Sequence, residues 1–89
     1  MICFEVHRNN EKVCTAGVDQ GVLSVHIDHL CSPKKRETSF LHLSVCGIAR
    51  PEGHSEHVKW VNLRQLSVGD EIRIRIITAE HCDKPTDSN

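Results

Sequence analysis

The sequence predicts an all-β fold, a single small antiparallel β-sandwich or partly open barrel of five to six strands. Apolar and polar residues alternate with a period of two in several short runs, which is typical of half-buried strands. Polar turn segments separate these runs, and none of them shows the longer period of a long helix. The 89 residues include only two Phe and one Trp. The core must therefore consist mainly of Val, Ile and Leu, which favours strands.

The first half of the chain predicts two hairpins. The run 2–7 alternates apolar and polar side chains, and the Asn pair at 9–10 provides a turn because Asn tolerates positive φ. The segment 12–17 is expected to return beside the first strand. Two longer alternating runs, 22–31 and 40–48, are joined by eight polar residues and predict a hairpin with an extended tip.

The second half contains the clearest strand in the sequence. In the segment IRIRI, Ile72, Ile74 and Ile76 alternate strictly with Arg73 and Arg75. A Gly-Asp turn precedes this strand. Before that turn, the sequence predicts a short strand over 58–61 and a helical turn at the leucines that follow it, which are spaced three residues apart.

We expect one β domain over residues 1–80 and a flexible polar C-terminal tail over 81–89, because the end of the chain lacks apolar alternation. The alternating apolar side chains form the predicted core. These residues are Ile2, Phe4, Val6, Leu23, Val25, Ile27, Leu41, Leu43, Val45, Ile72, Ile74 and Ile76.

Composition argues against several functional classes. With 11 basic and 12 acidic residues, the chain lacks the basic surface on which dedicated nucleic-acid or membrane binders depend. No apolar run approaches the roughly 20 residues of a membrane span, and no signal peptide is visible. The five cysteines are odd in number and irregularly spaced, which indicates reduced thiols and a cytoplasmic location.

The segment HIDHLC is rich in residue types that bind metals. Strand alternation places His26 and Asp28 on one face and His29 and Cys31 on the other, so the whole segment cannot surround one ion. If the 22–31 and 40–48 strands pair, His42 can lie beside the first two residues. His26, Asp28 and His42 then form a candidate tetrahedral zinc site. The alternative is the ordinary polar pattern of a solvent-facing sheet.

A second candidate metal site is the loop segment HSEH. His54 and His57 are three residues apart, as His26 and His29 are, and Glu56 completes a set of three possible ligands. The alternative is a solvated loop. Zinc is the only cofactor that the sequence suggests.

No enzyme is predicted. The sequence lacks a nucleophile elbow, a phosphate-binding loop and a dinucleotide fingerprint. No cysteine lies in a recognisable thiol-enzyme signature. At this length, a deep substrate cleft is also hard to enclose.

Trp60, Arg73 and Arg75 are the candidate partner-binding residues, because Trp and Arg are enriched at the energetic centres of interfaces. Trp60 has the alternative of closing one end of the core. The arginines, together with the basic tip at 34–36, also suggest a nucleic-acid-binding barrel. That alternative is poorly supported because stacking aromatic residues are nearly absent.

Two resemblances add to this interpretation. The segment VGDEIRI resembles the GD box, a Gly-Asp turn entering a strand that recurs in several small barrel families. The segments FEVHRNNEKVCTAGVDQGVLS, LHLSVCGI and EHVKWVNLRQLSVGDEIRIRI resemble a group of small, stand-alone bacterial proteins of unknown function. The second resemblance implies a β-rich cytoplasmic fold and supplies no catalytic residues.

The leading hypothesis is a non-enzymatic protein–protein interaction module. We expect a homodimer or a small partner of a larger bacterial protein, for instance an inhibitor of the immunity type or an assembly partner. The physical basis is that the chain is small, nearly neutral and has sheet edges open to pairing. The alternatives are a histidine-rich zinc protein and a small nucleic-acid-binding β-barrel.

Overall fold

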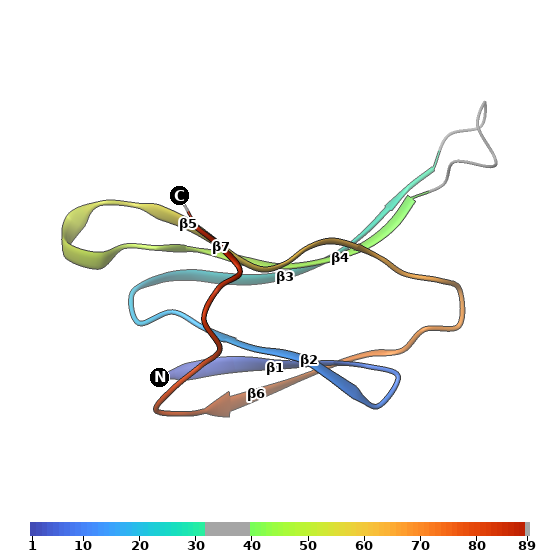
Figure 1. Ribbon diagram of the computed structural model, residues 1–89, viewed down its shortest axis with the longest axis horizontal. Coiled ribbons are helices and arrows are strands. Elements are labelled where there is room, and N and C mark those ends of the chain that lie inside the picture. The colour runs from blue at the N-terminus through green and yellow to red at the C-terminus, as the bar shows by residue number, and fades with distance from the viewer. Residues whose placement is uncertain (32–39, 89) are drawn as a thin grey trace.

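The computed structural model describes residues 1–31 and 40–88, and it confirms the all-β prediction. A three-stranded sheet of order β2-β1-β6 faces a four-stranded sheet of order β3-β4-β5-β7 (Figure 1). All strand pairs are antiparallel. The strands are β1 (Ile2–Arg8), β2 (Glu11–Gly17), β3 (Gly21–Leu30), β4 (Phe40–Ala49), β5 (Glu56–Gln65), β6 (Ile72–Thr78) and β7 (Asp87–Ser88), with the short 3₁₀ helix η2 (Pro51–Gly53) after β4.

Both predicted hairpins are present. β1 pairs with β2 around the turn at 9–10, where both asparagines have positive φ. β3 pairs with β4 in a continuous register from Gly21 opposite Ala49 to Leu30 opposite Phe40. The predicted polar tip of this second hairpin, with its basic residues at 34–36, lies outside the described residues.

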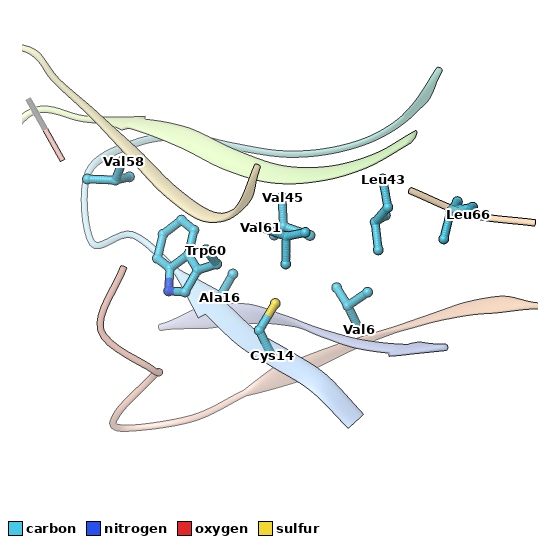
Figure 2. Close-up of a cluster of buried hydrophobic side chains, with 9 residues drawn as sticks. All are labelled: Val6, Cys14, Ala16, Leu43, Val45, Val58, Trp60, Val61 and Leu66. Atoms are coloured by element: carbon cyan, nitrogen blue, oxygen red, sulfur yellow. The ribbon is translucent and has the colours of Figure 1, made fainter. Parts of the chain in front are cut away.

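The core lies between the two sheets (Figure 2). Its buried residues are Val6, Cys14, Ala16, Leu43, Val45, Val58, Trp60, Val61 and Leu66. The core prediction is wrong for Ile2, Ile27, Ile74 and Ile76, all of which are exposed. Ile27, Ile74 and Ile76 lie on the edge strands β3 and β6, where the opposite sheet does not cover them. Ile2 is the first residue of β1.

Strand β5 is longer than the predicted strand over 58–61, and two irregularities interrupt its register with β4. Lys59 lies opposite Cys46, whereas Val61 lies opposite the preceding β4 residue, Val45, so β5 holds one extra residue there. In a regular strand, neighbouring side chains point to opposite faces. This bulge allows both Trp60 and Val61 to be buried in the core although they are adjacent.

The helical turn predicted just beyond Val61 is wrong, because β5 continues through Gln65. A second bulge is centred on Leu63, whose φ of 51° is unusual for a residue with a side chain. Its N–H donates a 3.2 Å hydrogen bond to the hydroxyl of Ser44. The spacing of the leucines at 63 and 66 therefore reflects a bulged strand.

The predicted flexible tail begins in a segment that is hydrogen-bonded to the three-stranded sheet. We call residues 79–88 the C-terminal strap. Ala79 N–H donates to the carbonyl of Met1 at 3.0 Å. Asp83 N–H donates to the carbonyl of Thr15 at 2.9 Å, while Thr15 N–H donates to Asp83 Oδ2 at 2.8 Å. The strap thereby satisfies backbone groups on the outer edge of β2.

The strap then crosses to the four-stranded sheet (Figure 1). The indole N–H of Trp60 donates to the carbonyl of Asp83, and Thr86 N–H donates to the carbonyl of Lys59. β7 completes the crossing by pairing with β5. The expected polar tail over 81–89 is thus hydrogen-bonded to both sheets as far as residue 88, and Asn89 lies outside the described residues. These hydrogen bonds come from backbone and polar groups, which carry no apolar pattern, and Cys82 also packs against the core.

Candidate functional site

The first candidate zinc site lies on the outer face of the four-stranded sheet. The β3–β4 register places Asp28 directly opposite His42 and His26 opposite Ser44. These positions alternate with the buried Leu43 and Val45, so their side chains point away from the core. The structure therefore brings Asp28 and His42 together and leaves His26 at a diagonal position of the same face.

The other candidate ligands lie apart from this pair. His57 is in β5 opposite Ile48, and His54 precedes the strand as the C-cap of η2. Among the residues that the structure describes, no group of three or more His, Cys, Asp or Glu side chains can hold a metal ion. The geometry of residues 1–31 and 40–86 thus gives no support to either predicted zinc site.

The same outer face carries a shallow hollow of about 230 Å³. Its polar lining includes His26, Cys46, His57 and Lys59, which come from all three long strands of the sheet. Sequence reasoning did not connect these residues, because the pairing of β5 with β4 decides which of their side chains lie next to one another. Since they form no metal-binding group, the hollow is not the site on which we base a function.

Two of the cysteines, Cys14 and Cys82, lack the environment of a nucleophile. Burial raises the pKa of the Cys14 thiol to about 11, and the nearby negative charge of Asp83 raises it further. Burial also raises the pKa of the Cys82 thiol. A nucleophilic cysteine needs the opposite shift, which nearby positive charge or a helix N-terminus produces. Both thiols therefore remain protonated at neutral pH.

The outer face of the three-stranded sheet carries a small charged network. Glu5 Oε1 lies 2.8 Å from His7 Nε2 and 3.3 Å from Arg75 Nη1. The hydrogen bond from His7 is the main reason that the pKa of Glu5 lies below its ordinary value. Arg73 lies opposite His7 on the same face and forms no ion pair with the described residues. Both predicted partner-binding arginines are thus exposed residues of β6, on the outer face of the sheet.

The inner face of β6 is apolar and only partly covered. Ile74 lies opposite the buried Val6, and Ile76 lies opposite Phe4, so both point to the core side of the sheet. They nevertheless remain 42% and 72% exposed. Within residues 1–31 and 40–88, β6 pairs only with β1, so its second edge is open. We call this edge, with Ile74 and Ile76 inside and Arg73 and Arg75 outside, the open edge.

An apolar groove continues from the start of the open edge toward β3. It has a volume of about 290 Å³, and its lining includes Ile72 of β6, Ile27 of β3 and Leu66. Val68 also lines it, on the loop that leads into β6, and is 99% exposed. The groove and the open edge together leave one side of the sandwich uncovered by the described part of the chain.

Trp60 does not contribute to this surface. Its side chain lies between the sheets and is only 5% exposed (Figure 2). The structure therefore selects the core alternative over the exposed anchor, and it also removes Trp60 as a stacking platform for nucleic-acid bases.

The GD-box resemblance corresponds to an ordered turn at the entrance to β6. Asp70 Oδ2 accepts hydrogen bonds from Arg8 Nη2 at 2.8 Å and from Ser67 N–H at 2.7 Å. Its Oδ1 accepts a third from Asn9 Nδ2 at 2.8 Å. Gly69, with φ of 99°, makes the turn possible. These bonds fix the start of β6 against the β1–β2 turn, so the open edge begins from a rigid point.

Comparisons with protein-family models, with curated proteins and with solved structures find no match. In the described residues, no helix is long and apolar enough to cross a membrane. Any assignment of function therefore depends on the chemistry of the site itself.

Proposed function

We propose that this protein is a non-enzymatic protein–protein interaction module that binds an extended segment of another chain by strand addition at the open edge. The observation that carries the proposal is the exposure of Ile74 and Ile76 on the core side of β6. The facing sheet does not cover these side chains. A guest strand paired with the free edge of β6 would place its own apolar side chains beside them and reduce their exposure.

Backbone chemistry supports the same site. Alternate N–H and C=O groups of an edge strand point away from its only neighbour and are free to pair with another chain. β6 is seven residues long and contains neither Pro nor Gly. Its charged residues point to the outer face, because Arg73 and Arg75 lie opposite His7 and Glu5. None of these features blocks the pairing of a guest strand with the free edge of β6.

The proposed module fits a small inhibitor or an assembly partner, since strand addition combines backbone affinity with side-chain pockets on alternate positions. The five free cysteines support a reducing setting such as the cytoplasm.

A peptide-display selection tests the proposal. We expect random linear peptides selected on the wild-type protein to bind in extended form and to shift the amide resonances of β6. Ile76→Lys places a charge on the inner face of the open edge and should abolish this binding. The matched control Val22→Lys changes an equally apolar, exposed strand residue on the other sheet and should leave binding intact.

Selected peptides that shift resonances of the four-stranded sheet, and that bind both variants equally, would contradict the proposal. Unchanged thermal unfolding of Ile76→Lys excludes misfolding as the reason for lost binding.

A further inference from the structure

We infer that the natural guest at the open edge is a strand in which apolar residues alternate with Asp or Glu, supplied by a different protein and not by a second copy of this chain. The inference rests on the proposed strand addition and specifies its partner. It follows from the charges that flank the free edge of β6.

The outer face beside this edge is positively charged. Arg75 contacts Glu5, but that carboxylate is shared with His7, and the Arg75 side chain is still 62% exposed. Arg73 has no acidic partner among the described residues. Two guanidinium groups therefore stand next to the position that a guest strand would occupy. Besides Glu5, this face has Glu71, which lies before the start of β6.

A guest strand must match the side chains on both faces of β6, the apolar inner face and the basic outer face. Residues directly opposite each other on paired strands share a face, and such pairs decide which sequences fit. The guest needs apolar side chains opposite Ile74 and Ile76, where water would otherwise remain against the isoleucines. On alternate positions it needs acidic side chains opposite Arg73 and Arg75, since like charges directly opposite one another are destabilising.

In the two antiparallel registers that place an isoleucine opposite both Ile74 and Ile76, a second copy of the chain meets only the first of these requirements. In antiparallel self-pairing about a twofold axis at Ile74, Arg73 of one protomer faces Arg75 of the other. With the axis at Arg75, this residue faces itself. Both registers keep the isoleucine faces together but place arginine against arginine. Charge complementarity thus favours an acidic partner strand.

Defined peptides test the inference. The probe is an end-blocked peptide alternating Val with Glu and long enough to pair with all of β6, and its control carries Lys in place of every Glu. We expect the acidic peptide to bind about tenfold more tightly, which is the scale of a pair of cross-strand charge contacts. The difference should shrink at about 1 M salt, where the Debye length is about 3 Å.

Protein variants provide the matched controls. Arg73→Glu removes no ion pair within the described residues and should abolish the preference between the two peptides, because Arg75 still favours the acidic one. Arg64→Glu makes the same change in net charge at an exposed position of β5 and should leave the preference unchanged.

The remaining outcomes separate the inference from the proposed function. Equal affinity for the two peptides, with amide shifts in β6, overturns the acidic partner and leaves strand addition standing. No binding and no shifts in β6 with either peptide overturn both. A wild-type dimer in sedimentation equilibrium that dissociates in Ile76→Lys identifies the second copy as the occupant and also overturns the inference.

Discussion

The indole N–H of Trp60 donates a 2.7 Å hydrogen bond to the backbone carbonyl of Asp83. This bond links the core to the C-terminal strap. Asp83 also forms hydrogen bonds with Thr15 on the edge of β2. Because Trp60 is the only tryptophan, its fluorescence reports on the docking of the strap. The hydrogen bond makes the strap part of the packed domain.

Asp83→Ala should lower the free energy of unfolding by about 1–3 kcal/mol, the cost of leaving a buried donor unsatisfied. The substitution removes the carboxylate that accepts the hydrogen bond of Thr15 N–H, while Thr15 stays buried. Urea unfolding followed by Trp60 fluorescence measures the change. Asp19→Ala, in the exposed turn before β3, is the control and should have little effect. Equal stabilities of the two variants would argue against the role of the strap.

Asp70 should give the protein an acid-sensitive contribution to stability. Its pKa lies below the ordinary value of 3.8, first because Ser67 N–H donates to the carboxylate and next because Asn9 does. A lowered pKa in the folded state stabilises the protein above the ordinary pKa, and this stabilisation is lost as the pH falls through the folded value. Asp70→Asn should therefore be less stable than wild type at about pH 6, with the difference shrinking below about pH 4. A difference that stays constant across this range, measured by urea unfolding, would contradict the prediction.

Leu63→Gly should stabilise the protein by about 0.5–1 kcal/mol, because Gly adopts positive φ without the steric cost of a side chain. Leu63 is more than half exposed, so little packing is lost. Arg64→Gly, at the next position of β5, should instead destabilise it by a comparable amount. Thermal unfolding measures the stability of the two variants. If both substitutions destabilise the protein, the backbone at Leu63 is not strained.

Alkylation should distinguish the cysteines. Cys31 is exposed, whereas Cys14 is buried with a pKa of about 11. At about pH 8, roughly one Cys14 thiol in a thousand is ionised, and the thiolate is the reactive form. Iodoacetamide should therefore modify Cys31 first and Cys14 only after denaturation, as mass spectrometry of timed samples can show. Rapid modification of native Cys14 would indicate that the core opens readily.

The sequence was sufficient to predict most of the strands and the β3–β4 hairpin, because alternation is a local property of the chain. It left open whether His42 lies beside His26 or Asp28, and the register places it opposite Asp28. It misled for Ile74 and Ile76, since alternation shows which face a residue occupies but not whether another sheet covers it. The exposed edge became visible only once the order β2-β1-β6 was known.

Two further features depend on contacts that leave no local pattern. The bulge that buries both Trp60 and Val61 depends on the pairing of β5 with β4. The strap is held by backbone groups and by the carboxylate of Asp83, so its polar sequence looks the same as that of a solvated tail. In both cases, tertiary hydrogen bonds override the expectation from composition.

The pairing of β1 with β6 also bears on how fast the domain folds. Ile2 lies opposite Thr78, so pairing β1 with β6 closes a long loop of chain. This loop contains β3, β4 and β5 of the other sheet. Such distant contacts slow folding, because the chain entropy is lost before the contacts form. We expect the β3–β4–β5 meander to form first and β6 to join late. Until then, its alternating isoleucines are exposed along two open edges instead of one, and this interval is when the chain is most prone to aggregate.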